Sequence, residues 1–367
     1  MKRTFPIVET TTCILIIIST AAPSASTDPS KFTFYKMPYP LSAPCDLCEG
    51  PDGALWGDDF AGPFIFRVDP NTSLVEHYQI PYTTPALNIT LPPEVGQIIG
   101  RTALACAIRP GADGNIYAAT GTRNQLARIN PKTRKIDIVV SLSVLGNLQP
   151  FNDLYTSPTG MWFTMTTANL IGFYSYNTSR VTVYRVPTPV AVPLGIYYAS
   201  DGYVYFCELL GNKMGRLDPR TGVIKEYIIP LGGQGPAVVR AETPPHAGKK
   251  HPYIWFTCSL GNSVGRLDPN TETGEIKLYS NPLLGGIPSE NTVDSKGNVW
   301  FTTLLQNTLC KIDGNGTVSY VQIPGTILLA PISSPLYFVL AVNYGPGNAL
   351  WFDLLLGGRV GRYSLDE

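Results

Sequence analysis

The stretch GYVYFCELLGNKMGRLDPRTGVIKEYIIP runs from Gly202 to Pro230, and a close copy, PYIWFTCSLGNSVGRLDPNTETGEIKLYSNP, runs from Pro252 to Pro282. Each copy holds an aromatic pair, a polar tip, a Gly-Asn step, the string GRLDP and a segment that ends in proline. Short β-rich runs divided by Gly, Asn, Asp and Pro are typical of strands joined by tight turns. A repeat of such units predicts the blades of a β-propeller.

Seven segments of the chain share this pattern: GPDGALWGDD, GADGNIYAAT, SPTGMWFTM, ASDGYVYFCE, HPYIWFTCS, DSKGNVWFTT and GPGNALWFDL. Their aromatic anchors are Trp56, Tyr117, Trp162, Tyr205, Trp255, Trp300 and Trp351. Most anchors follow one another at about 43–51 residues, a period that suits four short strands per blade. One blade cannot bury both of its faces, so the blades must stack into a ring. The sequence therefore predicts an all-β, seven-bladed β-propeller, with a β-sandwich or two smaller barrels as the alternative.

The two ends of the chain complement each other. The last anchor is followed only by GRVGRYSLDE (residues 358–367), which supplies a third strand but no fourth. The missing strand is found near the start, because KFTFYKMPYP (residues 31–40) resembles GVIKEYIIP of the repeat. We therefore expect the N-terminal strand to join the last blade beside residues 360–364, which removes an exposed sheet edge.

The first residues are predicted to form a targeting signal. Lys2 and Arg3 precede the short apolar run CILIIIST (residues 13–20), and AAPSAS offers small residues for cleavage near Ala25. We therefore expect residues 1–25 to be a signal peptide and residues 26–367 to be one propeller domain, secreted or in the lumen of the secretory pathway. No other apolar run is long enough for a membrane helix. The 27 basic and 27 acidic residues balance, which argues against a nucleic-acid partner.

Passage through the secretory pathway would allow asparagines to be glycosylated and cysteines to form disulfides. Four acceptor sequons are found, at Asn71, Asn88, Asn177 and Asn315, and we expect them to be glycosylated. Removal of the signal leaves six cysteines, an even number that permits up to three disulfides. We expect most of them to be paired in disulfides. For Cys45 and Cys48, which lie in PCDLC, a redox or metal-binding pair is the alternative. The six candidates are Cys45, Cys48, Cys106, Cys207, Cys258 and Cys310.

The repeat resembles that of the virginiamycin B lyase family over essentially the whole mature chain. The resemblance is strongest in four segments, YFCELLGNKMGRLDPRTGVIKEYIIP, WFTCSLGNSVGRLDP, WFTTLLQNTLCKID and WFDLLLGGRVGRY. The resemblance implies a seven-bladed propeller and, in the family, a Mg-dependent lyase that opens cyclic streptogramin antibiotics. In that family the catalytic His residues lie in P-H-[AG]-I motifs at the start of inner strands.

This chain departs from the family at those positions. About 11 residues before the anchors stand Cys45, Cys106, Phe151, Leu194, Ser289 and Leu340. In the fifth unit an insertion breaks this count, and the segment GPAVV suggests Ala237 as the equivalent position. The three histidines, His77, His246 and His251, fall elsewhere and are interpreted as solvated or turn residues. We therefore expect no metal and no other cofactor. A mostly apolar ring at one end of the channel favours an apolar small molecule as the partner.

A few polar residues accompany this ring, and they are the candidates for chemistry. Glu208, Asp153 and Asn152 are the candidate catalytic or orienting groups, and Glu208 takes the place of the Glu in the family's WFTE. Burial among apolar neighbours would raise the pKa of such a carboxyl and suit it to proton donation. A structural carboxylate that bonds loop amides is the alternative for Glu208. The candidate substrate-binding residues are Phe151, Leu194, Asp46, Ser289, Glu290 and Asn291.

Two classes of function agree with these residues. A secreted, lyase-like propeller without the metal-binding His is similar to fungal hetero-Diels–Alderases of tropolonic sesquiterpenoid biosynthesis. That resemblance implies a cycloaddition between a tropolone-derived o-quinone methide and a humulene-type terpene. A lyase-like C–O cleavage or lactone opening and a secreted ligand-binding propeller without chemistry are the alternatives, because the architecture hosts enzymes and binding proteins alike.

Overall fold

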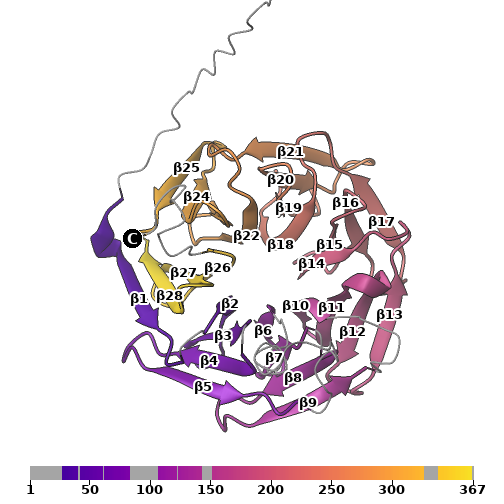
Figure 1. Cartoon of the computed structure of the whole chain (residues 1–367). Helices are drawn as coiled ribbons and strands as arrows, with labels where there is room; N and C mark the ends of the chain where they lie inside the picture. Colours follow the sequence, from indigo (N-terminus) through magenta and orange to yellow (C-terminus); the bar gives the residue numbers. More distant parts are fainter. Residues whose placement is uncertain are drawn as a thin grey trace, which may run out of the picture.

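The computed structural model describes residues 27–39, 42–60, 62–82, 106–121, 123–142, 151–325 and 338–365, without the side chains of Phe151 and Asn152. Over these residues the chain forms seven antiparallel sheets of four strands each. The sheets stand around a central axis like the blades of a propeller (Figure 1). The predicted seven-bladed architecture is confirmed.

Each blade runs from an inner strand at the axis to an outer strand at the rim. Blade 1 holds β2 (Pro44–Glu49), β3 (Leu55–Asp59), β4 (Phe64–Val68) and β5 (Val75–Gln79). Blade 2 holds β6 (Ile108–Pro110), β7 (Ile116–Ala119), β8 (Gln125–Ile129) and β9 (Ile136–Ser141). Blade 3 holds β10 (Phe151–Ser157), β11 (Gly160–Met165), β12 (Leu170–Ser175) and β13 (Val181–Arg185). Blade 4 holds β14 (Pro193–Tyr198), β15 (Val204–Glu208), β16 (Lys213–Leu217) and β17 (Ile224–Ile228).

The remaining blades continue the same order. Blade 5 holds β18 (Pro236–Thr243), β19 (Tyr253–Cys258), β20 (Ser263–Asp268) and β21 (Glu275–Ser280). Blade 6 holds β22 (Pro288–Val293), β23 (Val299–Thr303), β24 (Thr308–Ile312) and β25 (Val318–Gln322). Blade 7 holds β26 (Val342–Gly345), β27 (Ala349–Leu354) and β28 (Arg359–Ser364) together with β1 (Phe32–Lys36). Two short 3-10 turns, η1 (Pro29–Lys31) and η2 (Thr166–Ala168), are also present.

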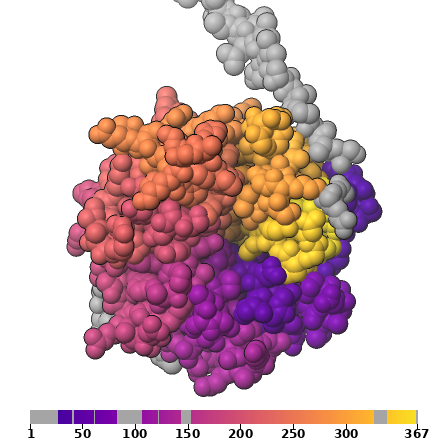
Figure 2. All heavy atoms as spheres, turned by 180° about the vertical axis from the view of Figure 1, so that it is seen from behind, coloured from indigo at the N-terminus to yellow at the C-terminus, as the bar shows by residue number. Residues whose placement is uncertain are grey.

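The ring closes through the two ends of the described chain. Strand β1 pairs antiparallel with β28, so that Phe32 lies opposite Tyr363 and Lys36 opposite Arg359. Both views show the indigo N-terminal segment against the yellow C-terminal one (Figures 1 and 2). The predicted closure is confirmed, and the outer edge of β28 is paired rather than exposed.

Aromatic side chains fill the space between blades and explain the repeat. In β15, Tyr205 and Cys207 pack toward blade 5, while Val204 and Phe206 pack toward blade 3. The Phe206 ring lies over Gly215 of β16, and a Cβ at that glycine would collide with the ring. The WF…GR pattern therefore corresponds to one packing contact, in which an aromatic ring packs over a glycine on the neighbouring strand.

The predicted glycosylation sites are exposed wherever the structure describes them. Asn71, Asn177 and Asn315 lie in the turns that join β4 to β5, β12 to β13 and β24 to β25. Asn88 falls outside the described residues. No helix among the described residues is long and apolar enough to cross a bilayer.

Candidate functional site

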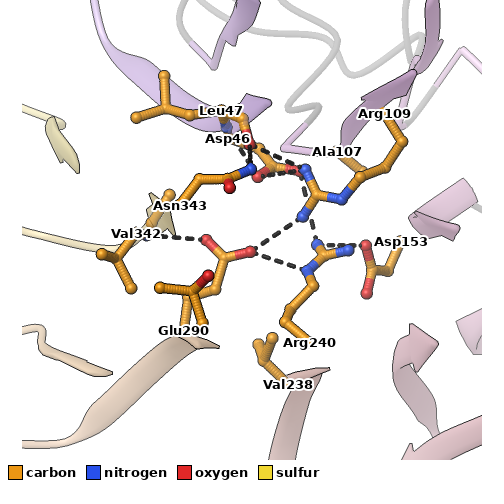
Figure 3. Close-up of polar contacts among 12 residues, drawn as sticks. Asp46, Leu47, Ala107, Arg109, Asp153, Val238, Arg240, Glu290, Val342 and Asn343 are labelled. Atoms are coloured by element: carbon orange, nitrogen blue, oxygen red, sulfur yellow. Dashed lines mark hydrogen bonds and ion pairs between the residues drawn. The ribbon is translucent and has the colours of Figure 1, made fainter. Parts of the chain in front are cut away.

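Five charged side chains meet where the inner strands surround the channel (Figure 3). The guanidinium groups of Arg109 on β6 and Arg240 on β18 both contact Glu290 Oε1 on β22, at 3.0 and 2.8 Å. Arg109 also pairs with Asp46 on β2 at 2.8 Å, and Arg240 with Asp153 on β10 at 2.6 Å. All five side chains are at most 8% exposed. We call these five residues the channel cluster.

The three carboxylates of the channel cluster also join successive blades. Asp46 Oδ2 accepts from the backbone N–H of Ile108 in blade 2 at 2.9 Å. Asp153 Oδ2 accepts from Ile196 N–H in blade 4, also at 2.9 Å. The remaining carboxylate, Glu290, accepts the N–H of a blade 7 strand through Oε2, at 3.1 Å. A buried charge is tolerated when it is paired and its remaining lone pairs are bonded, and these contacts meet both conditions.

Burial shapes the protonation of the cluster. Burial and the nearby Asp46 carboxylate raise the pKa of Glu290 to about 7, although Arg240 and Arg109 oppose the shift. Burial also raises the pKa of Asp153. Burial alone would lower the pKa of Arg109, but Asp46 and Glu290 raise it, so the guanidinium stays charged. At Glu290 the effect of burial therefore outweighs that of the two guanidinium groups.

A cavity of about 280 Å³ lies at the end of the channel where the inner strands begin. Its wall is largely aliphatic, and its floor consists of all members of the channel cluster except Arg109. Its two serines are engaged, because Ser259 donates to the Pro288 carbonyl and Ser289 to the Ile287 carbonyl. We call this cavity the apolar mouth. Its aliphatic wall consists of Leu194, Ala237, Val238, Ile287, Leu304, Leu340 and Ala341.

A second cavity, of about 300 Å³, lies at the other end of the inner strands. Its lining is more polar and includes Tyr155, Tyr197 and Asn343. Arg240 and Glu290 line both cavities, so the channel cluster separates them. We call this second cavity the polar mouth. The channel therefore has two distinct openings with different chemistry.

The structure distributes the predicted site residues among several places. The apolar mouth is lined by Leu194, Ser289 and the three cluster carboxylates Asp46, Asp153 and Glu290. Asn291 lines the polar mouth instead. Phe151 and Asn152 lie at the start of β10, and their side chains fall outside the described part of the structure. The ring positions Cys106, Ala237 and Leu340 also line the apolar mouth.

Comparison with known proteins agrees with this geometry. A family model described as the virginiamycin B lyase family matches residues 97–247. The solved structure of a streptogramin B lyase superposes with a TM-score of 0.73 at 20% identity, over 91% of this chain and 97% of that chain. This chain is a seven-bladed propeller with the fold of these lyases. Virginiamycin B lyase from Staphylococcus aureus gives a TM-score of 0.72 at 20% identity, over 91% of this chain and 99% of that chain. A catalytically inactive variant of that lyase with quinupristin gives a TM-score of 0.73 at the same identity and coverage.

At 20% identity these structures establish the fold of the lyase-like propeller and not its reaction. No curated protein matches the chain. The family's magnesium does not fit the apolar mouth of this propeller. The three carboxylates there are already paired with two guanidinium groups, whose positive charge opposes a divalent cation.

The histidines of the lyase-like propeller lie away from both mouths. His77 on β5 packs against aromatic rings that include Phe64 and Phe66, and burial lowers its pKa. His251 Nδ1 contacts Asp201 Oδ2 at 2.8 Å, and the His246 ring packs edge-on to Tyr253. Among the described residues, no group of three or more His, Cys, Asp or Glu side chains is arranged to hold a metal ion.

Glu208 is not among the residues that line the apolar mouth. Residues alternate along β15, so its side chain points between blades 3 and 4, near Thr188 and Lys213. It is fully buried, and neither carboxylate oxygen has a hydrogen-bond partner among the described residues. Burial and the nearby Glu226 carboxylate raise its pKa to about 7. Glu208 is thus a buried carboxyl with a raised pKa that lies outside the apolar mouth.

Arg109 and Arg240 are the site residues that sequence reasoning missed. Each stands three residues after a ring position, Cys106 and Ala237, on an inner strand. A signal was available, because carboxylates predicted at the channel must find positive partners there when they are buried. Basic residues on the inner strands are therefore the expected partners of these carboxylates.

The prediction that most cysteines are paired is wrong. One disulfide joins Cys45 of β2 to Cys106 just before β6, with Cα atoms 5.2 Å apart, and links blades 1 and 2 at the apolar mouth. The other four, Cys48, Cys207, Cys258 and Cys310, are buried thiols. Cys48 and Cys310 face different inter-blade cores and cannot meet. Cys207 and Cys258 share one core but stay unpaired, and burial raises the pKa of Cys258 to about 12, which leaves it unreactive.

Proposed function

We propose that this protein is a secreted enzyme of secondary metabolism. It catalyses a metal-independent (hetero-)Diels–Alder cycloaddition between a tropolone-derived o-quinone methide and a humulene-type sesquiterpene. The observation that carries the proposal is the apolar mouth, an aliphatic wall above a charged floor whose groups are bonded to one another. Such a cavity can hold and orient apolar reactants, and its serines and carboxylates are already engaged.

The reaction needs little more than positioning. The C=C–C=O unit of the quinone methide and the C=C of the terpene form one C–C bond and one C–O bond, and no atom or proton is lost. Holding two such partners in a reactive geometry can lower the barrier by roughly 7–11 kcal/mol in the best cases. Their apolar surfaces supply the binding free energy when they leave water.

Arg240 is the polar group that orients the electron-poor partner in this proposal. Its guanidinium lines the apolar mouth and is fixed by Asp153 and Glu290 at 2.6 and 2.8 Å. A fixed positive charge close to the quinone methide oxygen polarises the diene through its field and favours the transition state. The carboxylates then serve as positioning residues for Arg240 rather than as acids or bases.

A C–O lyase or lactone-opening reaction is the second candidate. It is favoured by the family model and by the solved lyases with the same fold. Bond cleavage of that kind needs a proton acceptor and a proton donor, and the carboxylates at the apolar mouth are bonded to guanidinium and backbone N–H groups. A ligand-binding propeller without chemistry is the third candidate.

A direct assay separates the three candidates. The protein is incubated with humulene and an o-quinone methide generated in place, and the rate and enantiomeric ratio of the adduct are compared with the spontaneous reaction. We expect a faster reaction, one dominant enantiomer and no effect of EDTA. Opening of a streptogramin lactone that EDTA abolishes and Mg²⁺ restores would favour the lyase, and binding without turnover would favour the non-catalytic propeller.

A further inference from the structure

Four exposed leucines occupy the same position in four successive blades. Each follows the aromatic anchor of its blade and lies in the turn that joins the second strand to the third. Their side chains are 43–73% exposed. Single exposed leucines are ordinary, but a set that recurs at one place on one side of a molecule marks a contact surface. We call this set the leucine rim. It consists of Leu210, Leu260, Leu305 and Leu356, on blades 4 to 7.

The leucine rim lies on the face of the ring where the apolar mouth opens. Ser259 and Leu304 line that cavity, and each directly precedes a leucine of the rim. The backbone N–H of Leu305 donates to the Gly286 carbonyl at 3.2 Å, and the next residue of that loop, Ile287, also lines the cavity. The rim is therefore continuous with the aliphatic wall of the apolar mouth.

The loops on this face of blades 4 to 7 carry no charge wherever the structure describes them. None of them contains Asp, Glu, Lys or Arg, although such residues make up 15% of the chain. On the opposite face the turns are charged, with Asp218 and Arg220 between β16 and β17 and Lys249 and Lys250 before β19. The uncharged face can leave bulk water without stripping any ion of its hydration. Its described loops are residues 186–192, 209–212, 229–235, 259–262, 281–287, 304–307 and 355–358.

Exposed charged residues at the strand ends next to these loops are basic. They are Arg185 at the end of β13, Arg359 at the start of β28 and Lys36, which lies opposite Arg359 at the end of β1. Long basic side chains lay their aliphatic stems along an apolar surface while their charged ends reach phosphate groups. An apolar, uncharged face bordered by basic side chains fits a lipid surface, where phosphates lie above hydrocarbon.

Val190 shows that the backbone of this face is held in place. Its φ is 53°, in the left-handed region that a β-branched residue rarely adopts, and its side chain is exposed. The next residue, Ala191, accepts the N–H of Leu210 at 3.0 Å, which ties the loop to a turn of the leucine rim. Backbone strain of this kind persists only where the surrounding structure enforces it, and it gathers at functional surfaces.

We propose that the leucine rim seats this protein on the surface of a lipid bilayer, with the apolar mouth turned toward the lipid. Leucine side chains that pass from water into the headgroup and acyl boundary stabilise the contact. Lipid adapts to side chains carried on separate turns, whereas a second protein needs a complementary surface. Direct entry of apolar reactants from the lipid into the apolar mouth is a consequence that rests on the proposed function, but the lipid contact itself does not.

Co-sedimentation with vesicles tests the proposal, without any substrate. Residues 26–367 are used, so that the apolar run of residues 13–20 does not contribute to binding. The vesicles consist of phosphatidylcholine alone or of phosphatidylcholine with phosphatidylserine. We expect the bound fraction to rise saturably with lipid for both compositions and to persist at about 0.5 M NaCl, because apolar contacts are not screened by salt. At low salt, phosphatidylserine should strengthen binding through the basic side chains.

A matched pair of variants assigns the binding to this face. Leu260→Asp changes a leucine of the rim, and Leu74→Asp makes the same change at an exposed leucine on the opposite face, in the turn between β4 and β5. Leu260→Asp should lower the lipid partition coefficient on the order of tenfold, and Leu74→Asp should change it less than about twofold. Melting temperatures show that both variants are folded.

Three results would overturn the proposal: no sedimentation with either kind of vesicle, equal binding by the two variants, or binding that needs phosphatidylserine and is lost at about 0.5 M NaCl. Sedimentation velocity without lipid tests the other occupant, a second copy of this chain. We expect a monomer at about 50 µM, and a dimer that Leu260→Asp alone dissociates would also overturn the proposal. Since no measurement here uses the adduct-forming reaction, its failure and a failure of the proposed function are distinguishable.

Discussion

Arg240 is the residue on which the organisation of the channel depends most. Its guanidinium donates to Asp153 from blade 3 and to Glu290 from blade 6, and also to the Leu154 carbonyl at 3.1 Å. It stands in the partition between the two mouths. The net contribution of a buried ion pair to stability is often small, but removal of one partner leaves the others charged and buried.

Arg240→Met should therefore destabilise the protein by about 3–5 kcal/mol, because the buried Asp153 loses the guanidinium it pairs with and Glu290 keeps only Arg109. The free energy of unfolding, measured in urea, tests this expectation. Arg128→Met is the matched control, since Arg128 pairs with Asp137 at 3.5 Å on the surface and should contribute less than about 1 kcal/mol. Equal losses in the two variants would contradict the special role of the channel cluster.

Glu208 makes a prediction about pH. Burial raises its pKa in the folded protein to about 7, above the ordinary value of the unfolded chain. The folded state therefore holds a proton that the unfolded state has lost, so this carboxyl favours folding at low pH and that contribution is lost as the pH rises through about 7. Compared with Glu208→Gln, the wild type should be similarly stable at about pH 5 and less stable at about pH 8.

Melting temperatures of both proteins at the two pH values measure this difference. The variant should also keep the activity of the wild type, because Glu208 does not line the apolar mouth. A wild type that gains stability relative to Glu208→Gln as the pH rises would show that the carboxylate is stabilised in its ionised form.

At the scale of strands, alternation decides which predicted residues reach the channel. The starts of the inner strands could be placed from the repeat, and Leu194, Ser289 and Leu340 do line one cavity. The side chain of Glu208 could not be placed in this way. Its position at the end of β15 matches the family pattern, but its side chain points between blades 3 and 4. Spacing along the chain predicts how far along a strand a residue lies. A shift of one residue moves its side chain to the opposite face of the blade.

The places of the cysteines on the strands also determine which of them are paired. In residues 26–367, four cysteines should react with a maleimide after denaturation without reductant, and two more only after reduction. In the native protein the four thiols should be protected because they are buried. Mass spectrometry counts the labels in each state. Two labels or none in the denatured, unreduced chain would mean that further disulfides are present.

For the whole molecule, the fold was predictable because each blade repeats one local pattern and closure follows from the unmatched strands at the two ends. The repeat placed the three carboxylates of the channel cluster at the channel, but their pairing with two arginines was not predictable from local patterns. The members of the cluster stand on β2, β6, β10, β18 and β22, and they meet only once the ring brings distant inner strands together. Pairing of buried charges across the ring is a property of the closed molecule and leaves no local signature in any one blade.

The central claim is that the apolar mouth holds the reactants, and one pair of variants tests it most directly. Leu194→Asp places a charge in the aliphatic wall, while Leu231→Asp makes the same change at a residue that is 92% exposed and outside the cavity. With both variants shown to be folded by circular dichroism, the rate of adduct formation from humulene and the o-quinone methide is measured. Leu194→Asp should lose on the order of 10²-fold or more, and Leu231→Asp should stay within about twofold of the wild type. A folded Leu194→Asp protein that turns over as fast as the wild type would contradict the account.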